Sequence, residues 1–283
     1  MFDHLLFPTD GSSGADRVLD HVVDIATTHD ATLHLLYVSP DDPKRRPQAG
    51  DAEHFLSDAV ARAKGSGLDT VDEIRHGEPY EEIVAYADDT DVDLVVMPTH
   101  GRTGLSRLVL GSTTERVVRG STVPVLTVSP DADGDLSYPY ERLLSPTDGS
   151  TCATTALRLG SELAVDIDAD LHVLSVVDVA TLAADVRGPQ LIDALEENAD
   201  RFVEEADAIA TEIGVGSVTS AVEHGVSISS EIRAYVEAHD IDLVVIGTHG
   251  RSGFDRFMLG SVAEKLLRRS PVPVLTVRER DED

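Results

Sequence analysis

Apolar positions along the chain follow two alternating patterns, short runs typical of β-strands and longer stretches with helical spacing. In the first half, the strand-like runs are residues 4–8, 31–38, 69–75, 94–97 and 123–128. The helix-like stretches between them are residues 14–28, 52–66, 79–88 and 112–119. Strands and helices in alternation predict βαβ units, and therefore a parallel sheet with helices on both faces.

The chain repeats this pattern. Residues 4–12 (HLLFPTDGS) return 138 positions later as RLLSPTDGS, and residues 94–128 align without a gap 149 positions further on, with 21 identities in 35 positions. The offset rises by 11 (149 − 138), which places extra residues in the second copy, mostly between residues 178 and 200. The strands expected in this copy are residues 142–145, 170–176, 218–222, 243–246 and 272–277, with an amphipathic helix at 191–213.

Each copy has about 140 residues, enough for a domain with its own core. The joint between the copies falls where Pro, Gly and Asp dominate and apolar periodicity stops. We therefore expect one domain at residues 1–130, a linker at 131–139 and a second domain at 140–283.

Composition changes this picture mainly through charge. Asp and Glu number 52 against 23 Lys and Arg, a formal net charge of −29, which argues against nucleic-acid binding. The carboxylate excess, three lysines and 4% aromatic residues are typical of surfaces adapted to high salt, where the Debye length is roughly 3 Å at 1 M. We expect a halophilic archaeon as the source; an ordinary acidic cytosolic protein is the alternative.

The single cysteine and the lack of a long apolar stretch favour a cytoplasmic protein. Cys152 is the single cysteine, so an intramolecular disulfide is excluded, and no Cys/His cluster has zinc-site spacing. The N-terminal segment lacks a cationic region and reaches Pro8 early, and no stretch approaches 18 apolar residues. Neither a signal peptide nor a membrane span is expected.

The first loop of interest follows the first strand of each copy, as PTDGSS at residues 8–13 and PTDGST at 146–151. Ligands of open parallel sheets bind beyond the carboxyl ends of the strands, which makes Asp10 and Asp148 ligand candidates. Helix capping is the alternative, because Asp, Gly and Ser are also the residues that begin a helix after a strand.

The second loop is more specific. Residues 247–262 read GTHGRSGFDRFMLGSV, a G-x-x-G-x9-G-S pattern directly after a buried strand. Glycines let backbone N–H groups approach an anion, and the helix that begins at Gly260-Ser261 adds positive potential. The spacing is neither that of a P-loop nor that of the dinucleotide fingerprint. The loop therefore predicts a site for a phosphate-sized anion.

Charged residues recur inside this loop. Arg102 and Arg251, and also Arg107 and Arg256, could contact the anion or pair with surface carboxylates. His100 and His249 precede the second glycine, but no nucleophile or paired carboxylate stands at a recognisable spacing. We expect these histidines to stabilise the loop, and we predict neither a catalytic residue nor a protein metal site.

The P-T-D-G-S turn, the G-x-x-G-x9-G-S loop and the final V-P-V-L-T-V strand, each present twice in the same order, resemble the universal stress protein family in a tandem two-domain form. The resemblance covers nearly the whole chain. It implies two Rossmann-like (flavodoxin-like) α/β domains, each with a five-stranded parallel sheet of order 3-2-1-4-5. It also implies domains that pair through their last strands, an intramolecular pseudo-dimer that could assemble into a larger homo-oligomer.

The resemblance implies ATP or a related adenine nucleotide as ligand, which could carry Mg²⁺, although some members bind none. In the second copy it places Asp148 against the ribose or adenine, Val176 beside the adenine and Gly247 beside the ribose. It implies that the phosphates are bound by backbone N–H groups and the serine hydroxyl at Gly250, Gly260, Ser261 and Val262. Thr248 and Arg251 complete the site that the resemblance implies. The matching residues of the first copy are Asp10, Val38, Gly101, Arg102, Gly111, Ser112 and Thr113.

One position differs between the copies. Pro98 stands where the second copy has Gly247, and proline has no N–H and carries a ring. Occupancy of the first site is therefore open.

Three functions remain at this stage. The first is a nucleotide-binding stress-response or signalling protein without fast turnover. The second is a ligand-free interaction module that pairs through residues 123–128 and 272–277. The third is a slow adenine-nucleotide hydrolase whose rate would depend on His249.

Overall fold

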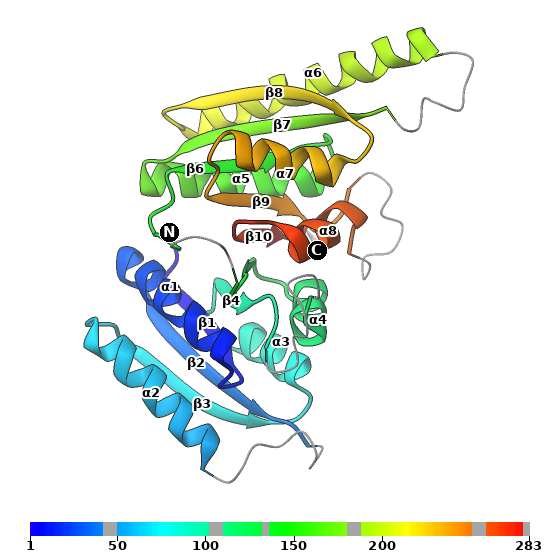
Figure 1. Cartoon of the computed structure of the whole chain (residues 1–283). Helices are drawn as coiled ribbons and strands as arrows, with labels where there is room; N and C mark the ends of the chain where they lie inside the picture. The colour runs from blue at the N-terminus through cyan, green and yellow to red at the C-terminus, as the bar shows by residue number, and fades with distance from the viewer. Residues whose placement is uncertain (42–49, 102–109, 132–135, 180–187, 251–258, 280–283) are drawn as a thin grey trace. The chain divides into compact units, whose positions relative to one another are not determined.

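The computed structural model describes residues 1–41, 50–101, 110–131, 136–179, 188–250 and 259–279. The chain divides into two compact units, Met1–Pro139 (unit 1) and Tyr140–Asp283 (unit 2). Strands and helices alternate along each unit (Figure 1). None of the described helices is both long enough and apolar enough to cross a membrane.

Unit 1 is a parallel sheet covered by helices. Its strands are β1 (His4–Thr9), β2 (Thr32–Ser39), β3 (Thr70–His76), β4 (Leu94–Pro98) and β5 (Val125–Val128), in the order β3-β2-β1-β4-β5. Its helices are α1 (Ser13–His29), α2 (Asp51–Gly65), α3 (Pro79–Asp89) and α4 (Ser112–Gly120). Helices α1 and α2 pack on one face of this sheet and α3 and α4 on the other (Figure 1).

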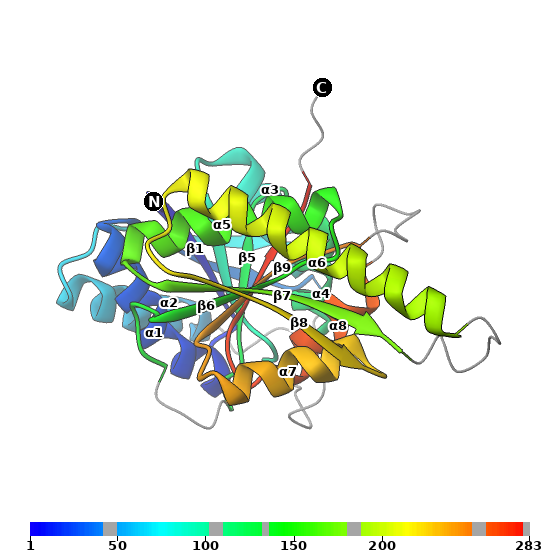
Figure 2. The same ribbon diagram turned by 90° about the horizontal axis from the view of Figure 1, so that it is seen from above.

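Unit 2 repeats this arrangement. Its strands are β6 (Arg142–Pro146), β7 (Asp170–Asp178), β8 (Val218–Gly225), β9 (Leu243–Gly247) and β10 (Val274–Val277), in the order β8-β7-β6-β9-β10. Figure 2 shows α5 (Thr151–Ile167) and α6 (Gly188–Ile213) on one face, with α7 (Ile228–Ala238) and α8 (Ser261–Arg269) on the other. Numbered within each unit, both sheets have the order 3-2-1-4-5, so the predicted fold is confirmed.

The last strand of each unit begins later than predicted. Strands β5 and β10 begin at Val125 and Val274, two residues later than expected, because Pro124 and Pro273 have no N–H for the ladder. The carbonyl oxygens of these prolines still accept bonds from Val95 and Val244.

The extra residues of the second copy lengthen one helix. Helix α6 has 26 residues where its counterpart α2 has 15, a difference of 11 that equals the change in offset. It begins at Gly188 rather than at the expected residue 191, and Figure 1 shows its first turns extending past the ends of β7 and β8.

The central strands are apolar on both faces. In β1, Leu5, Leu6 and Phe7 are fully buried, as are Leu143 and Leu144 in β6. Strands with helices on both sides have no solvent face, so their apolar residues run consecutively instead of alternating. This burial positions the carboxyl ends of β1 and β6, from which the PTDGS loops emerge.

A buried histidine makes the stability of unit 1 dependent on pH. His21 of α1 is 2% exposed and lies edge-on to the ring of Tyr138. Burial lowers the pKa of His21 from 6.5 to about 4, although a hydrogen bond with the backbone of Leu136 opposes the shift. Between these two pKa values the unfolded chain binds more protons than the folded chain.

We therefore expect the free energy of unfolding of unit 1 to be unaffected by His21 above pH 6.5. It should decrease as pH falls from 6.5 toward 4, because His21 then binds a proton in the unfolded chain only. The loss amounts to about 2 kcal/mol at pH 5 and about 3 kcal/mol at pH 4, from about 1.36 kcal/mol for each pH unit below 6.5. Denaturant unfolding at pH 7.5 and pH 5, at constant KCl, measures it. The variant His21→Gln should flatten the profile, and an unchanged profile in that variant would contradict the assignment to His21.

Candidate functional site

A pocket of about 430 Å³ lies in unit 2 at the carboxyl ends of β6, β7 and β9. Strand β6 has β7 on one side and β9 on the other, so the pocket occupies the topological switch point of the sheet. Its volume is typical of small-molecule sites. Among its polar lining residues are Thr147, Asp148, Ser175, Asp178, Asn198, Thr248, His249 and Ser261. Its apolar walls include Leu174, Val176, Leu195, Phe202, Ile228 and Ile232.

The structure brings eight predicted residues of the second copy to this pocket: Asp148, Val176, Gly247, Thr248, Gly250, Gly260, Ser261 and Val262. Arg251, Arg256, Arg102 and Arg107 lie outside the described residues. That the gathered residues hold a ligand remains a prediction.

The aspartate of the first loop is held by the backbone and lies against a glycine of the second loop. Asp148 Oδ1 accepts a hydrogen bond from the Ser150 N–H at 3.0 Å. Its Oδ2 lies 2.6 Å from the place that a Cβ on Gly250 would take. In unit 1, Asp10 Oδ2 is 2.3 Å from the equivalent place on Gly101. The second glycine of G-x-x-G therefore makes room for the aspartate that joins the two loops.

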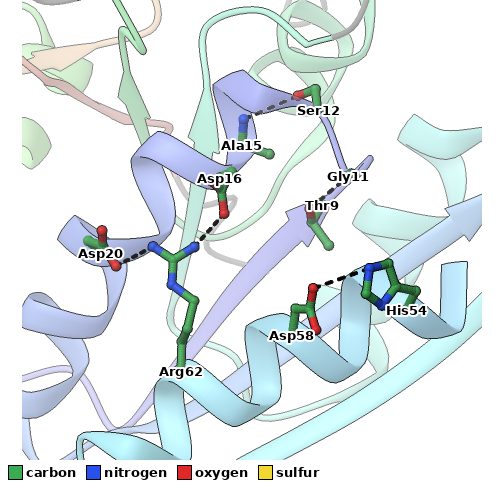
Figure 3. A network of polar contacts seen from close by, with 9 residues as sticks. All are labelled: Thr9, Gly11, Ser12, Ala15, Asp16, Asp20, His54, Asp58 and Arg62. Carbon is green, nitrogen blue, oxygen red and sulfur yellow. Dashed lines mark hydrogen bonds and ion pairs between the residues drawn. The ribbon is translucent and has the colours of Figure 1, made fainter. Parts of the chain in front are cut away.

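The serines of the first loop are helix caps, as the capping alternative expected. Ser150 Oγ accepts from the Ala153 N–H at 3.2 Å, and Ser12 Oγ accepts from the Ala15 N–H at 3.1 Å (Figure 3). Capping explains the serines, whereas Asp148 remains exposed to the pocket.

Helix α8, whose start lines the pocket, has no such cap. Gly260 is the N-cap residue of α8, and no side chain among the described residues caps this helix start. Its own N–H donates to Thr248 O at 2.8 Å and closes the base of the loop. This differs from the expectation that Gly260 itself donates to phosphate. The N–H groups that remain at the start of α8 belong to Ser261, Val262 and Ala263, which all line the pocket.

The acidic residue of this helix is neutralised locally. Glu264 lies in the first turn of α8 and forms an ion pair with Arg268 at 2.8 Å. The start of α8 therefore presents N–H groups and the positive end of the helix dipole to the pocket.

The loop histidines contact the loop itself. His249 Nδ1 lies 2.9 Å from Thr248 Oγ1, and His100 Nδ1 lies 3.1 Å from Thr99 Oγ1. His100 Nε2 also lies 3.2 Å from Asp131 Oδ2. These contacts support the expected loop-stabilising role. No group of three His, Cys, Asp or Glu residues in the described segments could hold a metal ion.

In unit 1, the strand ends and the start of α4 carry the matching residues Asp10, Val38, Gly101, Gly111, Ser112 and Thr113.

An aromatic ring packs against the first loop of unit 1, residues 8–13. A Cβ on Gly11 would lie 2.2 Å from Cδ2 of Phe55, so the ring of this α2 residue packs directly against the glycine. Figure 3 shows Arg62 of the same helix in ion pairs with Asp16 and Asp20 of α1, which hold α2 beside α1.

Sequence reasoning missed the residues that α6 and α7 contribute. Leu195 and Phe202 of α6, with Ile228 and Ile232 of α7, form much of the apolar wall. Their helical periodicity indicated burial against the sheet, and it did not indicate which end of the sheet each residue would reach.

Comparison with known proteins shows which family this chain resembles in sequence and in structure. The family model described as the Universal stress protein family matches residues 1–129 and again 139–278. A universal stress protein of Methanocaldococcus jannaschii is 33% identical over 143 residues, 50% of this chain and 83% of that protein. The crystal structure of a universal stress protein from Archaeoglobus fulgidus matches with a TM-score of 0.68 at 22% identity, covering 97% of this chain and 98% of that one. Another family structure, solved in complex with cAMP, covers 46% of this chain and 99% of its own at 26% identity and a TM-score of 0.39.

Proposed function

Because this chain belongs to the universal stress protein family, with two family units in tandem, we propose that unit 2 binds an adenine nucleotide and that the protein acts through this bound state in stress response or signalling. Members of the family bind adenine nucleotides. The observation that carries the proposal is the pocket at the switch point of unit 2, whose lining combines the start of α8 with apolar walls.

Different parts of the pocket lining suit different parts of a nucleotide. Val176, Ile228 and Ile232 offer apolar contacts to a base. The start of α8 offers backbone N–H groups and positive potential to a phosphate. The carboxylate of Asp148 can accept hydrogen bonds from ribose hydroxyls.

The charge of the whole chain does not oppose this assignment. Backbone donors act on a phosphate over a few ångströms, whereas distant carboxylates are screened by salt over a Debye length of roughly 3 Å at 1 M. We propose a saline cytoplasm as the setting of the protein. Mg²⁺, if it accompanies the nucleotide, would then bind mainly through phosphates and water.

Fast turnover is not part of the proposal. His249, on which hydrolysis would depend, is engaged with Thr248. The bound nucleotide, rather than its hydrolysis, is therefore proposed as the functional state.

Calorimetry in molar KCl tests the binding directly. We expect ATP, ADP, AMP or cAMP to bind, and adenosine and inorganic phosphate to bind more weakly than the best nucleotide because each lacks one half of the contacts. Mass spectrometry of the nucleotide that copurifies at high salt identifies the physiological ligand. The proposal fails if none of the four nucleotides produces heat or a shift in thermal unfolding.

A further inference from the structure

The pocket of unit 2 extends over both faces of strand β7. His172 Nδ1 lies 3.0 Å from the hydroxyl oxygen of Tyr235 in α7, so the even-numbered residues of β7 face α7. Side chains of a strand alternate between its two faces, and β7 pairs with β6 and β8 without a break in register. Ser175 and Val177 therefore face α5 and α6. These two residues and the α7-facing Val176 all line the pocket.

The part of the pocket on the α6 side of β7, called the α6 compartment below, is mainly apolar. Its lining residues come from three elements and are Ala153 of α5, Ser175 and Val177 of β7, and Leu195, Ala199 and Phe202 of α6. The guanidinium of Arg201 lies over the Phe202 ring, 5.3 Å from its centroid. Ser175 is only 4% exposed, so the compartment reaches down to the sheet.

Unit 1 has a tyrosine at the strand position that Ser175 holds in unit 2. Strands β1 and β2 pair in the same register as β6 and β7, which makes Tyr37 and Ser175 equivalent. His34 Nδ1 lies 2.8 Å from the hydroxyl oxygen of Tyr86 in α3, so Tyr37, three residues later, faces α1 and α2. Tyr37 is 2% exposed. Its ring therefore lies between the strand and these helices, in the space that corresponds to the α6 compartment.

The helix over this space carries an aromatic residue in both units. Phe55 and Phe202 each stand eight residues before an alanine, Ala63 or Ala210, whose carbonyl oxygen accepts an N–H from the residue that follows the helix. The Phe55 ring packs against Gly11, and Phe202 lines the pocket. The two units thus share the aromatic residue of the helix and differ in the strand residue, which is tyrosine in unit 1 and serine in unit 2.

We propose that the α6 compartment of unit 2 binds an aromatic ring of about the size of a phenol, on the opposite face of β7 from the place proposed for a nucleotide base. The occupant is argued from unit 1, where the side chain of Tyr37 fills the equivalent space. The same space in unit 2 is open and accepts the ring of a ligand. The apolar walls contact the ring, and the Ser175 hydroxyl can donate or accept a hydrogen bond with a polar substituent. The ligand class is a small hydroxylated aromatic molecule.

p-Cresol, which has the same atoms as the tyrosine side chain, is the probe. We expect the wild-type protein to bind it with a Kd of about 1 mM or lower in calorimetry at molar KCl. Ser175→Tyr should abolish this binding and raise the unfolding temperature of unit 2, because the ring of the protein then fills the compartment. Ser175→Ala is the matched control and should keep p-cresol binding. Absence of binding in wild type, or unchanged binding in a folded Ser175→Tyr protein, would overturn the proposal.

Unit 1 provides the reverse test, which also decides the proposal if Ser175→Tyr does not fold. Tyr37→Ser should lower the unfolding temperature of unit 1 by about 10 °C, because it leaves a cavity in place of the ring. p-Cresol should restore part of that loss and bind as a second molecule per chain. A Tyr37→Ser protein that p-cresol does not stabilise would overturn the use of Tyr37 as the guide to the ligand.

AMP separates the α6 compartment from the proposed nucleotide site. We expect AMP and p-cresol to bind together, since Val176 and Ser175 face opposite sides of β7. Displacement of p-cresol by AMP would overturn a separate aromatic site. A protein that binds p-cresol and no nucleotide would refute the proposed function and leave this inference standing.

Discussion

Replacement of Gly260 by aspartate should lower the affinity of unit 2 for ATP at least a hundredfold. A Cβ at this position would lie 3.1 Å from Thr248 O, which requires a small adjustment of the loop base. The new carboxylate would stand at the N-cap of α8 and accept the N–H groups proposed to bind phosphate. Two unit charges 4 Å apart at an effective dielectric constant of 20 repel by about 4 kcal/mol. Calorimetry with ATP in molar KCl measures the loss.

The chain offers a matched control for this variant. Gly111 begins α4 of unit 1 in the same conformation as Gly260, with φ −60° against −62°. We expect Gly111→Asp to leave the affinity of unit 2 for ATP unchanged. An aspartate N-cap stabilises a helix, so loss of binding in Gly260→Asp without loss of stability would separate the effect from unfolding. Wild-type affinity in Gly260→Asp would contradict the placement of phosphate at α8.

The second large effect concerns the core of unit 1. Phe7 is fully buried in the central strand β1, and we expect Phe7→Ala to destabilise unit 1 by about 3–5 kcal/mol through lost burial and a cavity. Differential scanning calorimetry should show an earlier transition for unit 1, with the transition of unit 2 less affected. A loss below about 1 kcal/mol would contradict the close packing around β1.

The equivalent position in unit 2 gives the opposite expectation. Ser145 is fully buried, and its Oγ has no hydrogen-bond partner within the described segments. Ser145→Ala removes this unsatisfied hydroxyl and should stabilise unit 2 by about 1 kcal/mol. A loss of stability in Ser145→Ala would show that the hydroxyl has a partner there.

Much of the fold could be predicted because it depends on local patterns. The runs around Leu5 and Leu143 identify strands buried on both faces, and the internal repeat identifies two units of one design. Proline chemistry caused the clearest errors: β5 and β10 begin only after Pro124 and Pro273, because a strand ladder needs an N–H that an apolar run does not guarantee.

The candidate site could be predicted only in part. Asp148 and Gly260 were identifiable from loop motifs, since turn chemistry is local. Phe202 and Ile232 were not, because a helix periodicity records which face is buried and not which end of the sheet that face reaches.

The sequence by itself determined the two α/β units, the order of their elements and the loops at the carboxyl ends of the strands, because these follow from apolar periodicity and from turn residues close together in the chain. Only the tertiary structure decided what each glycine does. Gly250 makes room for Asp148, Gly247 makes room for Cys152, and the Gly260 N–H bonds to Thr248 O instead of pointing to a ligand. Two of these three contacts join residues about a hundred positions apart, and their geometry exists only once strands and helices have packed.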